Sequence, residues 1–160
     1  MHIGTAIVGS LLLIVDGEIM GYEVIHTEEN DPRFNMPYAP AIKVTSGSIT
    51  FLSGVTAAPV YHSHPHIKSE FDDIPLDPGE QAAMAVEAMR DILAAAGGSL
   101  ADVVEVTRYI KDIDDNQDAI NRVLGQAFGD HRPATTTVEV VRLATDPRLV
   151  LELRAVAVID

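Results

Sequence analysis

The feature that most constrains the fold is the C-terminal third of the chain, where an amphipathic helix pattern leads into two β-like segments. The helix pattern begins near Asp114, and its apolar residues recur at helical spacing as far as Phe128. The segments that follow, 131–143 and 149–159, are rich in β-branched residues and alternate apolar with polar positions. A Thr-Asp-Pro turn at 145–147 separates them. A helix followed by strands of this kind predicts a layered domain of helices on a sheet.

The rest of the chain continues this alternation of strands and helices. A helix is predicted after Asp77, a good N-cap because Pro78 follows it and Glu80 takes the third helical position. The apolar stripe of this helix ends at Gly97-Gly98, where glycine favours termination. Alternation and β-branched content predict strands at 22–27, 41–45, 49–55 and 103–110.

The order of these elements is β, ββ, α, β, α, ββ, which predicts an α+β domain with both helices packed on one face of one sheet. Ser46-Gly47 predicts a hairpin between the strands on either side of it. A sheet covered on one side presents its second face either to water or to another subunit. We therefore expect a symmetric oligomer.

Charge and cysteine usage exclude several functional classes. A length of 160 residues fits one domain with a single core. Twenty-four acidic residues against eleven basic ones give a net charge of −13, which repels phosphate backbones and predicts no nucleic-acid partner. The absence of cysteine excludes disulfides, thiolate metal sites and cysteine nucleophiles, and it fits a cytoplasmic protein.

The N-terminal segment is expected to stand apart from the rest of the domain. Residues 3–15 form an apolar run that is too short to span a bilayer, and no basic region or small-residue cleavage site marks a secretory signal. We expect residues 1–21 to be an extension or the product of a misplaced start, with an extra edge strand as the alternative. Residues 22–160 then form the domain, with no membrane partner.

Four segments resemble the RidA/YjgF family of small trimeric proteins that hydrolyse reactive enamines and imines. They are YAPAIKV at 38–44, FLSG at 51–54, GGSLADVVEVTRYIKDIDD at 97–115, and the C-terminal third with HRPATTTVEVVRL at 131–143. The resemblance implies a chorismate-mutase-like (RidA-type) mixed sheet with two helices on one face. It also implies a homotrimer with small-molecule clefts between neighbouring subunits and no cofactor.

The resemblance also implies a set of cleft residues. Tyr38 matches a cleft tyrosine, Gly54 a glycine where the backbone approaches the substrate, and Asn121 an asparagine early in the second helix. Glu152 matches a glutamate of the last strand that holds the hydrolytic water. For Tyr38 the alternative is a core residue with a polar tip, and for Asn121 an exposed helix amide.

Several positions depart from the family pattern, and Ala39 and Pro40 stand where the segment around Tyr38 usually has a serine and a glutamine. Thr135 stands where relatives carry an arginine that binds the substrate carboxylate, and a threonine offers only one neutral hydroxyl. Thr135 and Thr137 are the further catalytic candidates on that strand. Arg154 follows Glu152 by two residues, so both side chains share one strand face. We hypothesise that Arg154 takes over carboxylate binding, with an intersubunit ion pair as the alternative.

The loop YHSHPHIKSEFDD is the other unusual feature. His62, His64 and His66 would share one face of an extended segment, and His64, His66 and Glu70 have the HxHxxxE spacing of cupin metal sites. A cupin needs a second motif with a further histidine, and none follows. We therefore predict no metal site, and place His62 and His64 among the substrate-binding candidates in a loop that shapes the cleft.

The leading hypothesis is hydrolysis of a small, carboxylate-bearing enamine or imine to a carbonyl compound and ammonia, without a cofactor. Protonation of the imine nitrogen makes its carbon electrophilic, and a positioned water attacks it. Two alternatives remain open. One is a non-catalytic binder of a small metabolite, because the usual arginine is absent. The other is a metal-dependent protein that uses the histidine loop.

Overall fold

The computed structural model describes residues 14–15, 18–19, 21–26, 38–60 and 63–160. Its main sheet has four strands in the order β5-β8-β6-β7. Their bounds are β5 Ser48–Phe51, β8 Leu151–Ile159, β6 Val103–Ile110 and β7 Ala134–Glu139. β8 is antiparallel to β5 and β6, whereas β6 and β7 are parallel, so the sheet is mixed.

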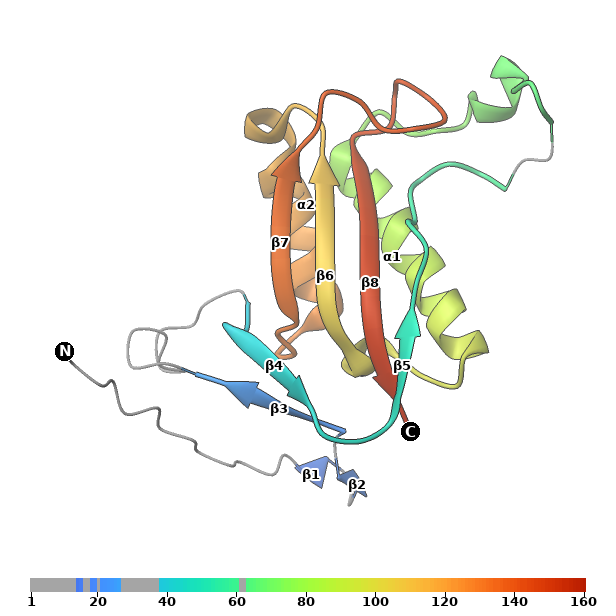
Figure 1. The fold of residues 1–160 in the computed structure, drawn as a ribbon. Helices are drawn as coiled ribbons and strands as arrows, with labels where there is room; N and C mark the ends of the chain where they lie inside the picture. Colours follow the sequence, from blue (N-terminus) through green and yellow to red (C-terminus); the bar gives the residue numbers. More distant parts are fainter. Residues whose placement is uncertain (1–13, 16–17, 20, 27–37, 61–62) are drawn as a thin grey trace.

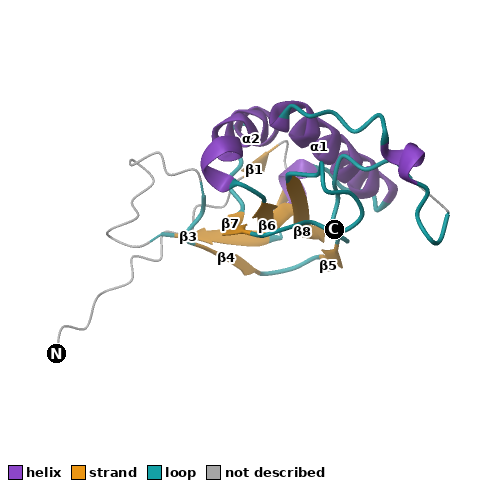
Figure 2. Cartoon of the chain, turned by 90° about the horizontal axis from the view of Figure 1, so that it is seen from above, coloured by secondary structure: helices purple, strands orange, loops and turns teal. Residues whose placement is uncertain are grey.

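Two helices, α1 (Pro78–Ala95) and α2 (Ile113–Phe128), cover the same face of this sheet (Figures 1 and 2). The predicted α+β layout with both helices on one face is thus confirmed. Short 3₁₀ helices at Lys68–Phe71 and Leu100–Asp102 precede α1 and β6. None of the helices in the described ranges has the length and hydrophobicity needed to cross a membrane.

The ends of α1 follow the signals in the sequence. A carboxylate oxygen of Asp77 accepts a hydrogen bond of 2.8 Å from the backbone N–H of Glu80, with Pro78 at the first helical position. The helix ends at Ala95, and Gly97 takes φ +86°, a conformation that favours glycine. The caps predicted for α1 are therefore correct.

The core lies between the two helices and the helix-facing side of the sheet. Alternate residues of β8 point into it, and they are Leu151, Leu153, Ala155 and Ala157. Met89 and Leu93 of α1 and Ile120 of α2 pack among them, fully buried. Each such large side chain contributes roughly 1.5–3 kcal/mol to folding. The intervening β8 residues, beginning with Glu152, point to the opposite face of the sheet.

One buried polar residue holds α1 to the segment that enters β8. Gln81 is fully buried, and its amide nitrogen donates 2.8 Å hydrogen bonds to the carbonyl oxygens of Pro75 and Arg148. Its amide oxygen accepts a 2.9 Å bond from the backbone N–H of Val150. All three contacts satisfy groups that would otherwise be buried without partners, so this side chain fixes the start of β8.

The predicted hairpin around Ser46-Gly47 is wrong. β4 (Ala41–Val44) pairs with β3 (Tyr22–Ile25), whereas β5 pairs with β8. The backbone N–H groups of Thr45 and Ser46 donate to the carbonyl of Gly21 instead of to a returning strand. Gly47, at φ +82°, then directs the chain to the edge of β8. Pairing with β8 continues past Phe51, through the Leu52 N–H to the carbonyl of Ala155 and the bridge of Val55 to Leu153, which is a longer ladder than the four residues of β4 could give.

The predicted single sheet is accordingly divided. β3 and β4 form a two-stranded ladder of their own, and so do β1 (Ile14–Val15) and β2 (Glu18–Ile19). On the helix-free face of the main sheet, several apolar side chains are solvent-exposed in the single chain: Ile49 by 55%, Phe51 by 70% and Val138 by 42%. An exposed apolar surface of this kind is typical of a protein interface.

Candidate functional site

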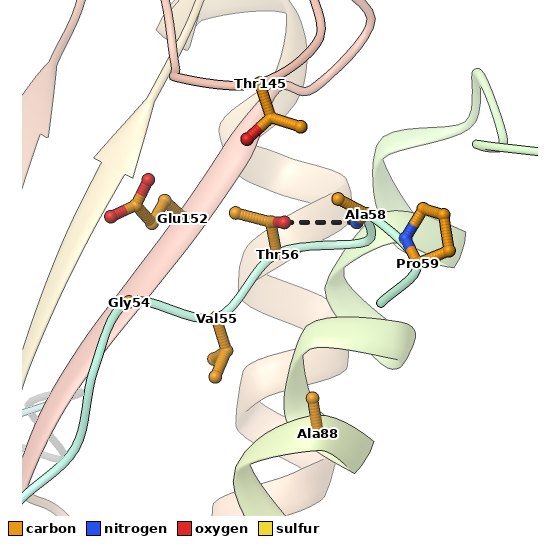
Figure 3. Close-up of a pocket in the computed structure, with 8 residues that line it drawn as sticks. All are labelled: Gly54, Val55, Thr56, Ala58, Pro59, Ala88, Thr145 and Glu152. Carbon is orange, nitrogen blue, oxygen red and sulfur yellow. Dashed lines mark hydrogen bonds between the residues drawn. The ribbon is translucent and has the colours of Figure 1, made fainter. Parts of the chain in front are cut away.

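An open cavity of about 380 Å³ lies along β8, where the chain leaves β5 (Figure 3). Val55 bridges to Leu153, which keeps this segment against the strand. The cavity is lined by residues from this segment, α1, the loop before β8, and β8: Gly54, Val55, Thr56, Ala58, Pro59, Ala88, Thr145 and Glu152. Two predicted site residues from distant parts of the sequence, Gly54 and Glu152, therefore meet at one cavity.

Gly54 and Glu152 are in unusually close contact. A Cβ atom added to Gly54 would lie 2.9 Å from Cδ and 3.2 Å from Cγ of Glu152, and closer still to Oε1. Carbon atoms in proteins normally stay about 3.5–4.0 Å apart. Only a residue without a side chain at position 54 lets the carboxylate take this place. The Glu152 side chain therefore favours glycine at position 54, and the approach of a substrate to the Gly54 backbone remains a prediction.

The Glu152 carboxylate is available for a ligand. Within the described part of the chain it has no hydrogen-bond or ion-pair partner, and it is half-buried. The other polar groups around the cavity are the hydroxyls of Thr56 and Thr145, and Thr56 accepts a 3.0 Å bond from the N–H of Ala58. Thr145 has φ +73°, an outlier for a β-branched residue that costs roughly 1–3 kcal/mol. Such strain is concentrated at functional sites.

A second group of predicted residues meets elsewhere, where α2 packs on β6 and β7. Arg108 joins them: its Nε donates to Thr137 Oγ1 at 2.8 Å, and one terminal nitrogen donates to Asn121 Oδ1 at 2.6 Å. Arg108 and Thr137 are register partners on neighbouring parallel strands. Burial lowers the pKa of Arg108 from its ordinary value. A half-buried guanidinium thus lies between two candidate residues.

Thr135 and Tyr38 lie at the start of β7. The Thr135 hydroxyl donates a 3.1 Å bond to the carbonyl of Pro133. The same carbonyl accepts a 3.4 Å bond from the backbone N–H of Ala39, which brings the neighbouring Tyr38 close to this strand. Tyr38 is 37% exposed, so it is not the core residue of the alternative interpretation.

Arg154 shares a strand face with Glu152, as its spacing predicts, but it does not line the cavity. A terminal nitrogen of Arg154 lies 3.3 Å from a carboxylate oxygen of Glu105 in the same chain. Glu105 also accepts a 2.6 Å bond from Thr107. Both side chains of the ion pair are partly exposed, and such pairs are worth roughly 0.2–1 kcal/mol. Its role in carboxylate binding remains a prediction.

The structure describes the histidine loop only in part, because His62 lies outside the described residues. The rings of His64 and His66 are 5.4 Å apart, and His66 lies against Phe71. Ser63 donates a 2.7 Å bond to Glu70. In the ranges that the structure describes, no group of three or more histidine, aspartate or glutamate side chains could hold a metal ion.

A half-buried histidine, His131, lies beside the first residue of β6. His131 Nε2 donates to the carbonyl of Val103 at 2.6 Å, and its Nδ1 is 3.4 Å from the hydroxyl of Tyr22. Burial is the largest effect on both side chains. It lowers the pKa of His131 and, with the nearby carboxylate of Asp102, raises the pKa of Tyr22 to about 12. This pair links β3 to the main sheet.

Three residues at these sites were not predicted from the sequence: Arg108, Thr56 and Thr145. A signal for Arg108 was present, because the alternation in its strand gives it the same face as Val106 and Ile110, which are apolar and in the core. A charge on an apolar face is unusual and indicates a specific partner. Thr56 and Thr145 carry no comparable signal, since threonine is common in loops.

Comparison with known proteins gives consistent matches over most of the chain. The model of the family described as Endoribonuclease L-PSP matches residues 28–159. A RutC family protein of Pyrococcus abyssi is 36% identical over 148 residues, which are 86% of this chain and 98% of that protein. The Escherichia coli protein named "Putative reactive intermediate deaminase TdcF" is 32% identical over 126 residues, which are 76% of this chain and 86% of that protein.

Solved structures give the same result. The crystal structure of E. coli TdcF with bound serine superimposes with a TM-score of 0.58 and 32% identity, covering 78% of this chain and 90% of that one. A member of the YjgF/YER057c/UK114 family from Mycobacterium tuberculosis superimposes with a TM-score of 0.57 and 26% identity, covering 86% of this chain and 99% of that one.

Proposed function

Because this chain belongs to the RidA/YjgF family, we propose that it hydrolyses a small enamine or imine to a carbonyl compound and ammonia. The name of the similar E. coli protein, a reactive intermediate deaminase, supports this reaction class. The observation that carries the proposal is the contact of Gly54 with Glu152, which reserves an unpaired carboxylate for a ligand in an open cavity.

The chemistry follows from this arrangement. An enamine isomerises to its imine, and protonation of the nitrogen makes the imine carbon electrophilic. Glu152 accepts a hydrogen bond from a water molecule and directs its oxygen at that carbon; as the C–O bond forms, the carboxylate takes a proton from the water. Glu152 then returns this proton to the amine nitrogen of the carbinolamine. Ammonia leaves as the C–N bond breaks, and the hydroxyl loses its proton to the departing ammonia as the carbonyl forms. The Thr56 and Thr145 hydroxyls lie beside the same cavity and can bond to the polar atoms of the intermediate.

We propose further that the working form is a homotrimer with its sites between subunits. In one chain the candidate residues fall into two groups, with Gly54 and Glu152 beside β8, and Asn121 and Thr137 where α2 packs on the sheet. Glu152 points to the helix-free face of the sheet. Thr137 and Asn121 lie on the helix side with Arg108, whose register partner on β8 is the core residue Leu153, so neither group completes the other. A neighbouring copy that covers the exposed apolar face and reaches the β7 edge of the sheet would bring its own Gly54 and Glu152 to the Asn121 and Thr137 of this chain. Homo-oligomers with closed symmetry commonly form composite sites of this kind.

The name of the matched family model suggests a nuclease, but the charge of this chain opposes that activity. A net charge of −13 repels a polyanionic substrate at long range. A small metabolite with a single carboxylate is repelled much less, and a local cation can offset that repulsion inside a cleft. We therefore favour a small carboxylate-bearing substrate over RNA.

The proposal is tested by ammonia release from freshly generated 2-aminoacrylate, measured with the wild type, with Glu152→Gln and without protein. We expect the wild type to accelerate release and Glu152→Gln to lose roughly 100-fold or more in kcat/KM, as is usual when a catalytic base is removed. The matched control is Glu87→Gln, an exposed glutamate of α1 that should keep full activity. Wild-type activity in Glu152→Gln would overturn the role of Glu152.

The second candidate is a non-catalytic binder of small metabolites. It is favoured by Thr135, which stands where the resemblance expects an arginine. A protein that binds a small carboxylate but does not accelerate hydrolysis of 2-aminoacrylate or of larger 2-imino acids would support this candidate over the enzyme.

A further inference from the structure

We propose that Arg108 binds the carboxylate of the substrate, an inference that rests on the proposed function and names the residue that anchors the ligand. The bound group is a carboxylate next to the imine carbon. This role has moved one strand along the sheet, from the β7 position now occupied by Thr135 to Arg108 of β6.

The guanidinium of Arg108 is held in place and still has free donors. Thr137 takes the N–H of Nε, and Asn121 takes one N–H of a terminal nitrogen, at 2.8 Å and 2.6 Å. An arginine carries five N–H donors, so about three remain, all on the two terminal nitrogens. These donors can form the paired hydrogen bonds that match the two oxygens of a carboxylate. The side chain is therefore oriented by the protein before a ligand arrives.

Arg108 also lacks a counter-ion within the described part of the chain. Burial is the cause of its lowered pKa, and no neighbouring carboxylate opposes that effect. Arg148 and Arg154, by contrast, are paired with Asp146 and Glu105. A half-buried cation without an anion is costly unless a partner supplies the opposite charge. A ligand carboxylate would supply it.

The register of the sheet explains how Arg108 can replace a β7 arginine. Val106 is the register partner of Thr135, and Arg108 is the partner of Thr137, so all four side chains share a face with two-residue spacing. Neighbouring strands are roughly 5 Å apart, which an arginine side chain spans easily. Threonines at 135 and 137 leave room for its guanidinium. An arginine at 135 would place a second cation beside Arg108, which like-charge repulsion disfavours.

The competing explanation is that Arg108 only ties α2 to β7. The two roles predict different effects on charged and on neutral ligands. A structural tie supports every ligand equally, whereas a carboxylate anchor acts only on ligands that carry the negative charge. Pyruvate, the product of 2-aminoacrylate hydrolysis, and pyruvamide, its neutral analogue of similar shape, separate the two roles.

The experiment measures binding of pyruvate and pyruvamide by calorimetry to the wild type, Arg108→Met and Arg108→Lys. Arg90→Met, which removes an exposed arginine of α1 with the same change in net charge, is the control. We expect Arg108→Met to weaken pyruvate binding by roughly 10- to 150-fold, the worth of a charge-assisted hydrogen bond. Pyruvamide binding should stay within about twofold, and Arg90→Met should match the wild type. Arg108→Lys should recover only part of the pyruvate affinity, because lysine cannot form the fork.

Three results would overturn the inference. They are an unchanged pyruvate affinity in Arg108→Met, an equal loss for both ligands in Arg108→Met and Arg108→Lys, and a wild type that does not bind pyruvate. If Arg154→Met loses pyruvate binding and Arg108→Met does not, the anchor lies on the last strand instead. A wild type that binds pyruvate through Arg108 but does not hydrolyse imines would refute the proposed reaction and leave the anchor in place.

Discussion

Replacing Gly54 with alanine tests whether the position of the Glu152 carboxylate determines activity. The backbone at position 54 is not among the positive-φ glycines, which in the described residues are Gly47, Gly97 and Gly129, so alanine introduces no backbone strain there. The added methyl group would lie 2.9 Å from Cδ of Glu152, and even closer to Oε1. The carboxylate must therefore turn away from the cavity wall.

The size of the effect follows from these distances. Restoring an ordinary separation of about 3.5–4.0 Å requires a shift of roughly 1 Å in the carboxylate. A misplacement of that size costs about 100-fold in rate when a group must direct a water molecule at a reacting carbon. Folding should be little affected, because Glu152 is half-buried and can rotate. Alanine also stabilises the folded state by roughly 0.4–1 kcal/mol, since it reduces the conformational entropy of the unfolded chain.

The assay compares kcat/KM for 2-aminoacrylate and the urea unfolding midpoint in Gly54→Ala and in Gly125→Ala. Gly125 lies within α2, and a Cβ there meets nothing within 4 Å, so alanine should stabilise the helix by roughly 0.5–1 kcal/mol and leave activity unchanged. Gly54→Ala added to Glu152→Gln should cause little further loss, because both act through one carboxylate. Wild-type turnover in Gly54→Ala, or fully additive losses in the double variant, would refute the steric reasoning.

Two further predictions concern stability. Gln81→Leu leaves the carbonyls of Pro75 and Arg148 and the N–H of Val150 without partners, so we expect a loss of about 3–5 kcal/mol in urea unfolding; less than about 1 kcal/mol would contradict it. The lowered pKa of His131 means that the unfolded chain binds a proton more readily than the folded one. Unfolding free energy should therefore be highest above pH about 6.5 and fall as the pH drops through the lower folded-state pKa. A pH series in which His131→Gln retains the full wild-type slope between about pH 7 and 5 would refute that assignment.

Much of the fold could be predicted from the sequence because its local signals agree with the packing. Asp77 and Gly97 mark the ends of α1 through capping and backbone conformation, which depend on a few neighbouring residues. The two-residue period of β8 likewise put Glu152 and Arg154 on one face, since alternation is a property of the strand itself. Strand pairing, by contrast, cannot be predicted from such local signals. Ser46-Gly47 permits a hairpin, yet whether β5 returns to β4 or joins β8 depends on which edge is open in three dimensions.

The candidate site was predictable only in part for the same reason. Gly54 and Glu152 were found by resemblance, and their contact explains why a glycine is needed. Arg108 was missed, because its significance depends on the partners that β7 and α2 bring to it, Thr137 and Asn121. The sequence directed attention to Arg154 because it is close to Glu152 along the strand. Glu105, the ion-pair partner of Arg154, lies on the neighbouring strand β6, and this pair could not be predicted from the spacing of residues along β8.

The central claim is that two groups of residues, separated within one chain, form one catalytic site between copies. Subunit complementation tests it most directly. Glu152→Gln and Arg108→Ala chains are co-expressed with different affinity tags, and mixed trimers are isolated by purifying on both tags in turn. In a cyclic trimer that contains both chains, about one of three sites unites an intact Glu152 with an intact Arg108 of the neighbour. We therefore predict about a third of the wild-type rate from two nearly inactive parents. Mixed trimers that remain as inactive as either parent would contradict the claim.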